Sequence, residues 1–170
     1  MIGFPARNET GAYYYRYIDL IRSDDVIHVL ETQFQELPRL FGAITEEKSL
    51  HRYASDKWSI REVLGHINDT ERLAVFRAFW FARGFSTPLP SFDQNVAVEG
   101  AHADATAWSR HIEEFLNVRT ATLSFFRNLP KDAWMRTGIA SDNPFTVRSL
   151  AYIAAGHAAH HVSILKERYL

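Results

Sequence analysis

Residues 57–72 read KWSIREVLGHINDTER, and this stretch marks the beginning of a long helix. Ser59 and Glu62 have the S-x-x-E spacing of a capping box, in which each side chain accepts a hydrogen bond from the backbone N–H of the other residue. Apolar residues then recur every three or four positions, as on one face of a helix. Gly84 allows the chain to leave the helix. The pattern predicts a helix from residue 59 to about residue 83.

Three further segments have the same helical period. One covers 24–42, begins after Ser23, and contains Pro38, which is predicted to kink the helix or end it early. Another covers 104–129 and is predicted to be capped by the aspartate at its start. Thr146 is predicted to open the last helix, which continues to the C-terminus.

The remaining segments show no strand pattern. Residues 1–22 carry a tyrosine cluster without sustained period and are predicted to form an arm over the core, with at most a short helical turn. The connection 85–103 contains two prolines and is long for a helix hairpin, so we expect it to form a wall of a functional cleft. Four long helices indicate an all-α bundle, with residues 1–170 forming one domain.

Two histidines lie one turn apart on the apolar face of the last helix. At about 100° per residue, His157 and His161 lie near the centre of that face, whereas His160 is about 90° away. Imidazoles at this spacing can bind one ion. The alternative is a pair of core histidines held by hydrogen bonds. His66 is about 80° from the centre of its own apolar face, so periodicity does not select it as a third ligand.

The other histidines are predicted to be ordinary surface residues. They lie in predicted loops or on predicted solvent faces: His28, His51, His102 and His111.

The composition excludes several classes of site and partner. The chain has no cysteine, so any metal must be held by nitrogen or oxygen. Lys and Arg total 19 against 20 for Asp and Glu, without a long block of one sign, and this argues against nucleic acid as a partner. The apolar runs are far shorter than the roughly 20 residues that span a bilayer. With no basic stretch and apolar run at its start, the chain is expected to be cytoplasmic, with no membrane partner.

Two segments together resemble the DinB-like (DinB/YfiT-like) family of metalloenzymes. The first is KWSIREVLGHINDTER at 57–72, and the second is GHAAHHVSIL at 156–165. The resemblance implies a four-helix bundle with an up-down-down-up connection, in which the second and last helices face each other. It also implies that His66, His157 and His161 are the metal ligands and that the protein is a homodimer.

Three neutral imidazoles with open positions are typical of a catalytic site, because structural sites usually have four protein ligands. Imidazole does not select one metal. We expect zinc or nickel first, with iron, manganese or copper as alternatives. Alanine follows His157, where HExxH metalloproteases carry their glutamate base, so peptide hydrolysis is disfavoured. Asp69 is a candidate catalytic residue, and the alternative is an ion pair with a nearby arginine.

The resemblance also implies a reaction. Family relatives include transferases and an isomerase that use low-molecular-weight thiols, so a small-thiol S-transferase is expected, with a small molecule as substrate. The competing hypothesis is a non-catalytic metal-binding or dimerising stress-response protein.

Overall fold

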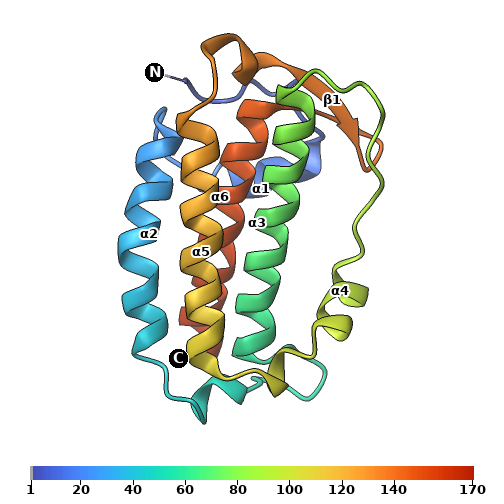
Figure 1. Ribbon diagram of the computed structural model, residues 1–170. Helices are drawn as coiled ribbons and strands as arrows, with labels where there is room; N and C mark the ends of the chain where they lie inside the picture. The colour runs from blue at the N-terminus through green and yellow to red at the C-terminus, as the bar shows by residue number, and fades with distance from the viewer. Residues whose placement is uncertain (1) are drawn as a thin grey trace.

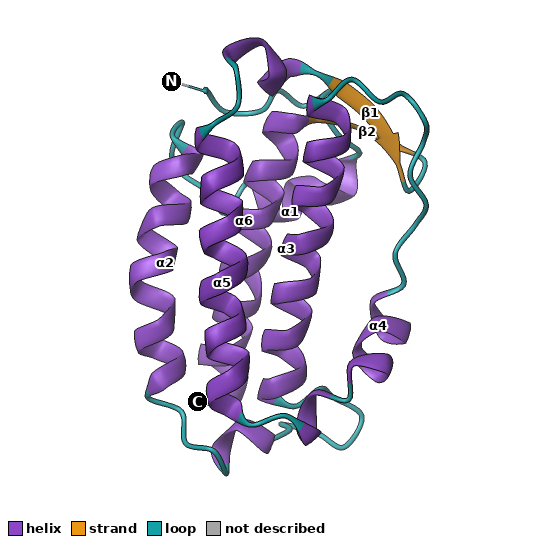
Figure 2. Cartoon of the chain, viewed as in Figure 1, coloured by secondary structure: helices purple, strands orange, loops and turns teal. Residues whose placement is uncertain are grey.

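The computed structural model describes residues 2–170. Four long helices form the bundle, as Figures 1 and 2 show. They are α2 (Val26–Gly42), α3 (Ile60–Ala82), α5 (Trp108–Arg127) and α6 (Val147–Ile164). Among them, α3 packs most extensively on α6 and also contacts α5, while α2 packs on α5 and α6. The predicted all-α bundle is therefore confirmed.

The helices do not alternate in direction along the chain. In Figure 1, α2 and α6 run downward, whereas α3 and α5 run upward. Two successive parallel helices require a connection that returns along the whole bundle, and the segment between α3 and α5 provides it. This is the up-down-down-up order that the family resemblance implies.

Smaller elements pack around the four long helices. The arm contains a 3-10 turn and the short helix α1 (Tyr15–Ile18), and the long connection contains α4 (Gln94–Ala101). Two antiparallel strands, β1 (Thr137–Ala140) and β2 (Asn143–Thr146), form a hairpin at the end of the bundle where α6 begins. Single 3-10 turns occupy Lys48–Leu50, Ala103–Ala105 and Lys131–Met135, and a π-helical turn, Leu165–Tyr169, ends the chain. The hairpin and α4 were not predicted from the sequence.

Most helix starts follow the predicted caps. The capping box of Ser59 and Glu62 is present in full, and Thr146 caps α6. Helix α2 begins at Val26, and its cap is Asp25 and not the expected Ser23, because the Asp25 carboxylate accepts the hydrogen bond from the backbone N–H of His28. It continues through Pro38 to Gly42, so the predicted end at residue 42 is confirmed and only the alternative of an early end at Pro38 is wrong.

The predicted start of the third long helix was also wrong. Helix α5 begins at Trp108, four residues after the predicted cap, Asp104. Asp104 instead accepts hydrogen bonds from Ser59 and Arg52. The first backbone N–H of α5 donates to the carboxylate of Glu46, 62 residues away in the chain, at 3.0 Å. A distant acid therefore replaces the local cap.

A buried ion pair ties three helices together. The Nε and Nη2 atoms of Arg119 on α5 donate to both carboxylate oxygens of Glu71 on α3, each at 2.8 Å. Its Nη1 donates to the carbonyl of Leu30 and to Gln33 on α2. Both charged side chains are almost fully excluded from solvent.

The arm packs tightly on α6. A Cβ atom at Gly156 would lie 2.2 Å from the carbonyl oxygen of Tyr17, so only glycine allows this approach. Nearer the beginning of the arm, Glu9 accepts hydrogen bonds from Thr146 and Arg148, at the start of α6. The arm is thus held at both ends of its contact with α6.

Alanine at Gly156 is expected to destabilise the protein by about 1–3 kcal/mol, because the added methyl group has no space against the Tyr17 backbone. Gly65, which is in the interior of α3, is the matched control, since a Cβ there meets only Ala103 at 3.9 Å. Gly65→Ala is expected to leave stability unchanged or to raise it by up to about 1 kcal/mol. Denaturant unfolding of both variants checks this prediction, and equal effects would contradict it.

None of the helices within residues 2–170 is long and apolar enough to cross a membrane.

Candidate metal centre

Three histidines from two helices converge on one point. His66 comes from α3, and His157 and His161 come from α6. The Nε2 atom of His157 lies 3.0 Å from Nε2 of His66 and 3.1 Å from Nε2 of His161. Each of the three side chains can offer one ligand atom, and these three atoms all lie within 4.8 Å of one another. Because imidazole nitrogens bind zinc at about 2.0–2.1 Å, this arrangement fits a single ion.

The histidines are held in their neutral form. Burial lowers the pKa of His66 to about 4 and that of His161 to about 3, and it lowers the pKa of His157 well below its ordinary value. Their mutual proximity disfavours protonation further for His157 and His161. A neutral imidazole has a free lone pair, so the three nitrogens are ready to bind a cation near neutral pH.

Aromatic rings fix the orientation of two of these side chains. The ring of Tyr17 contacts that of His157, with centroids 5.2 Å apart, and Trp58 contacts His66 at 4.9 Å. Thr70 lies one turn after His66, and its hydroxyl is 3.5 Å from Nδ1 of that histidine. These contacts point the Nε2 atoms toward one another.

A cavity of about 270 Å³ begins at this cluster. His66 and His157 form part of its wall. The arm contributes three tyrosines and the long connection contributes Phe92 and Gln94. The rest of the wall comes from α3, the hairpin and α6: Thr70, Leu73, Ala74, Arg77, Ser141, Phe145, Leu150 and Ile153. As expected, the long connection forms a wall of the cleft.

A family model of the DinB superfamily matches residues 30–165. The chain belongs to the DinB superfamily. Among solved structures, YfiT from Bacillus subtilis is similar to this protein. The structural alignment covers 97% of this chain and 91% of the YfiT chain, with a TM-score of 0.74 and 16% sequence identity. That protein is described as a probable metal-dependent hydrolase with an unusual four-helix bundle topology, and the likeness shows a shared fold. A comparison with curated proteins found no match.

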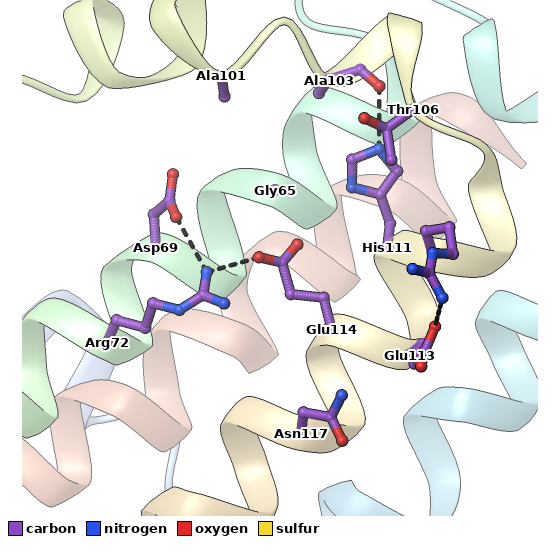
Figure 3. Close-up of a pocket in the computed structure, with 11 residues that line it drawn as sticks. Gly65, Asp69, Arg72, Ala101, Ala103, Thr106, His111, Glu113, Glu114 and Asn117 are labelled. Carbon is purple, nitrogen blue, oxygen red and sulfur yellow. Dashed lines mark hydrogen bonds and ion pairs between the residues drawn. The ribbon is translucent and has the colours of Figure 1, made fainter.

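In this DinB superfamily protein, Asp69 lies outside the histidine cluster. Figure 3 shows its carboxylate directed at Arg72, which also pairs with Glu114. The three residues line a separate pocket of about 480 Å³, to which none of the three clustered histidines contributes. Burial raises the pKa of Asp69, and the nearby Arg72 opposes this shift. The geometry favours the ion-pair alternative, and the catalytic role of Asp69 stays a prediction.

His111 differs from its expected place on the surface. It is only 5% exposed, and its Nε2 donates to the carbonyl of Ala103 at 2.9 Å. Its Nδ1 is buried without a hydrogen-bond partner among the described residues. The turn at Ala103–Ala105 covers this face of α5, and because that turn was not predicted, the burial of His111 could not be predicted either.

The depressed pKa values give the metal-free protein a pH-dependent stability. In the unfolded chain, His66 and His161 protonate near their ordinary pKa of about 6.5, but the folded protein keeps them neutral to about pH 4. Protons therefore bind the unfolded chain more readily than the folded protein below pH 6.5. The free energy of unfolding is highest above pH 6.5 and decreases as the pH falls toward 4, by up to about 1.4 kcal/mol per pH unit for each histidine.

Urea unfolding of chelator-treated protein at about pH 7.5 and about pH 5 measures this effect. A His51→Ala variant, which lacks an exposed histidine, is expected to show the same slope as the unmodified protein. Equal stability at both pH values would contradict the prediction.

Proposed function

We propose that this protein is a metal-dependent enzyme in which His66, His157 and His161 hold one divalent ion, with zinc or nickel expected first. The observation that supports this proposal is the convergence of three Nε2 atoms beside a cavity whose wall includes two of the histidines, His66 and His157. Three protein ligands leave room for a substrate atom at the ion, as catalytic sites require.

We further propose that the reaction is S-transfer from a small thiol. A divalent ion bound at this site would lower the pKa of a thiol that reaches it, so no side-chain base is needed. Activation of the thiol without a side-chain base is required here, because neither Asp nor Glu is among the described residues that line the cavity. The chain also has no cysteine of its own to act as nucleophile. In the reaction, the thiol loses its proton to solvent water, and the sulfur then bonds to an electrophilic carbon of the second substrate. The leaving group departs from that carbon with the electron pair of the broken bond.

The side chains of the cavity support binding and exclusion of water. Tyr13 and Tyr17 place their hydroxyl oxygens 3.4 Å apart in the arm. Burial raises the pKa of Tyr17, which keeps its hydroxyl neutral and able to donate a hydrogen bond to a substrate. Phe92 and Phe145 supply apolar surface for the electrophile. The arm and the long connection thus supply polar and apolar walls of the cavity beside the histidine cluster.

Hydrolysis, the activity named for YfiT, is the second candidate. It would use a water bound at the same position, but that water needs a base or a pKa near neutral. The same ion would lower the pKa of water as well as that of a thiol, but a free thiol starts from the lower pKa. The described cavity wall has no carboxylate to assist either group, so the thiol is favoured as nucleophile.

The test is cobalt substitution followed by titration with a small thiol. Cobalt(II) at a site of three imidazoles absorbs visible light, and a thiol that binds to it is expected to add a charge-transfer band in the near ultraviolet. A second assay follows the loss of free thiol and the formation of thioether with an aryl halide. A cobalt spectrum that millimolar thiol leaves unchanged would reject the transferase and leave hydrolysis and the non-catalytic metal-binding protein as the alternatives.

A further inference from the structure

Arg77 is a buried cation without an acidic partner. Three arginines in the described chain are buried: Arg61, Arg77 and Arg119. Arg61 pairs with Glu46 and Arg119 pairs with Glu71. No carboxylate within residues 2–170 lies within ion-pair distance of Arg77, which is 5% exposed. An unpaired buried charge is costly, so its retention calls for an explanation.

The guanidinium of Arg77 is held in place but is not saturated. Its Nη2 donates to the carbonyl of Pro90 at 3.0 Å and to the hydroxyl of Ser141 at 2.8 Å. Its Nε is buried and has no hydrogen-bond partner among the described residues. Ser141 belongs to the two-residue turn of the hairpin, where it has a positive φ of 49°. Tyr14 of the arm lies close enough to favour the charged form of the guanidinium, against the effect of burial. The hairpin and the long connection thus orient the arginine and leave its Nε without a partner.

Arg77 lies on the same side of α3 as His66. Eleven residues correspond to about three turns, which return the side chain to nearly the same direction and place the two Cα atoms about 16 Å apart along the helix. Thr70 and Leu73 lie between them on this face. All four side chains line the cavity, so one elongated ligand can contact both its histidine end and its arginine end.

The electrostatics of the cavity favour an anion. Arg77 is the only formally charged side chain among its described lining residues at neutral pH, because the histidines are neutral. A divalent ion at the histidines would add positive charge at the other end. The ring of Phe145 packs against the guanidinium, with the centroid 5.9 Å from its central carbon, and limits access of water.

We propose that Arg77 binds the carboxylate of an elongated substrate whose reacting group lies at the histidine cluster. The residue determines specificity: it selects a carboxylate-bearing thiol or electrophile over a neutral one and fixes its position along the cavity. This inference rests on the proposed function for the reacting end of the substrate. The carboxylate end depends on Arg77 alone and can be tested without a metal.

A purely structural role for Arg77 is the alternative, because its hydrogen bonds join α3 to the long connection and to the hairpin. That role would affect stability but would give no preference for charged ligands. The test therefore measures ligand preference.

The first experiment titrates metal-free protein with hexanoate and with hexan-1-ol in a calorimeter. Hexanoate is expected to bind at least about tenfold more tightly, as a charge-assisted hydrogen bond implies. The preference is expected to disappear in Arg77→Gln and to remain, at least in part, in Arg77→Lys, which keeps the charge if the first variant folds poorly. Arg83→Gln removes an exposed charge at the end of the same helix and is expected to behave like the unmodified protein.

The second experiment repeats the comparison on cobalt-loaded protein with 6-mercaptohexanoate and 6-mercaptohexan-1-ol, read from the thiol-to-cobalt band. The same preference for the carboxylate supports the full proposal. Equal binding of both thiols would overturn the role of Arg77 and leave the proposed function standing. If the protein takes up no cobalt but prefers hexanoate, the proposed function fails while the carboxylate site stands. Equal affinity for hexanoate and hexan-1-ol overturns the carboxylate site in either case.

Discussion

His157→Ala is expected to abolish metal binding, lowering the metal content from about one ion per chain to near zero. His157 is the central member of the cluster, since its Nε2 lies within 3.1 Å of Nε2 of both other histidines. Loss of one of three ligands is expected to weaken affinity by far more than the 10- to 100-fold that is typical of losing an outer-shell partner. Elemental analysis of purified, reconstituted protein measures the effect, and thiol transfer should be lost with the metal.

The chain offers a matched control for this variant. His160 lies in the same helix between His157 and His161, is partly exposed, and contacts Tyr17 at a ring distance of 5.4 Å. His160→Ala is expected to retain its metal, whereas His161→Ala is expected to lose it. If the three variants lose metal to the same extent, or if the unmodified protein takes up none, the ligand set is wrong.

Arg119→Met is expected to produce the largest loss of stability, about 3–5 kcal/mol. The substitution leaves the carboxylate of Glu71 buried without its partner, and that side chain is only 2% exposed. For a chain of this length, such a loss corresponds to a fall in Tm of roughly 6–20 °C. Thermal unfolding followed by circular dichroism measures it.

Two further variants separate the buried charge from lost packing. Arg110→Met breaks an exposed ion pair with Glu113 on the same helix and is expected to cost less than about 1 kcal/mol. Replacing both Arg119 and Glu71 by methionine removes the unpaired charge and is expected to recover part of the lost stability. A double variant that is no more stable than Arg119→Met would show that packing is the dominant effect.

Local patterns were sufficient to predict the bundle and two of the clustered histidines. The capping box at Ser59 involves residues only three positions apart, so the sequence displays it directly, and Thr146 likewise caps the helix that it precedes. His157 and His161 stand one turn apart in a single helix, so the helical period alone places them together. The direction of the helices and the place of His66 came from the family resemblance, not from the period.

The remaining features depend on contacts between distant segments. His66 lies at the edge of the apolar face of α3 on a helical wheel. It is nevertheless buried, because Trp58 and α6 cover that edge in the folded protein. The hairpin turn uses Ser141 and Asp142 with positive φ in place of the Asn-Gly that signals such turns, and Pro144 lies within its second strand. Helix α5 is capped by Glu46, which no local spacing could reveal. The sequence does not distinguish Arg77 from any other arginine in a helix, because its burial without an acidic partner depends on how the chain folds.

The contact between the arm and α6 also orders events during synthesis. The ribosome makes Glu9 of the arm before it makes Arg148 on α6, the partner that lies 139 residues further along the chain. The arm must therefore stay undocked while the segment between them is translated. Because Tyr17 contacts His157 and the arm lines the cavity, the ligand pocket can form only after α6 has been made.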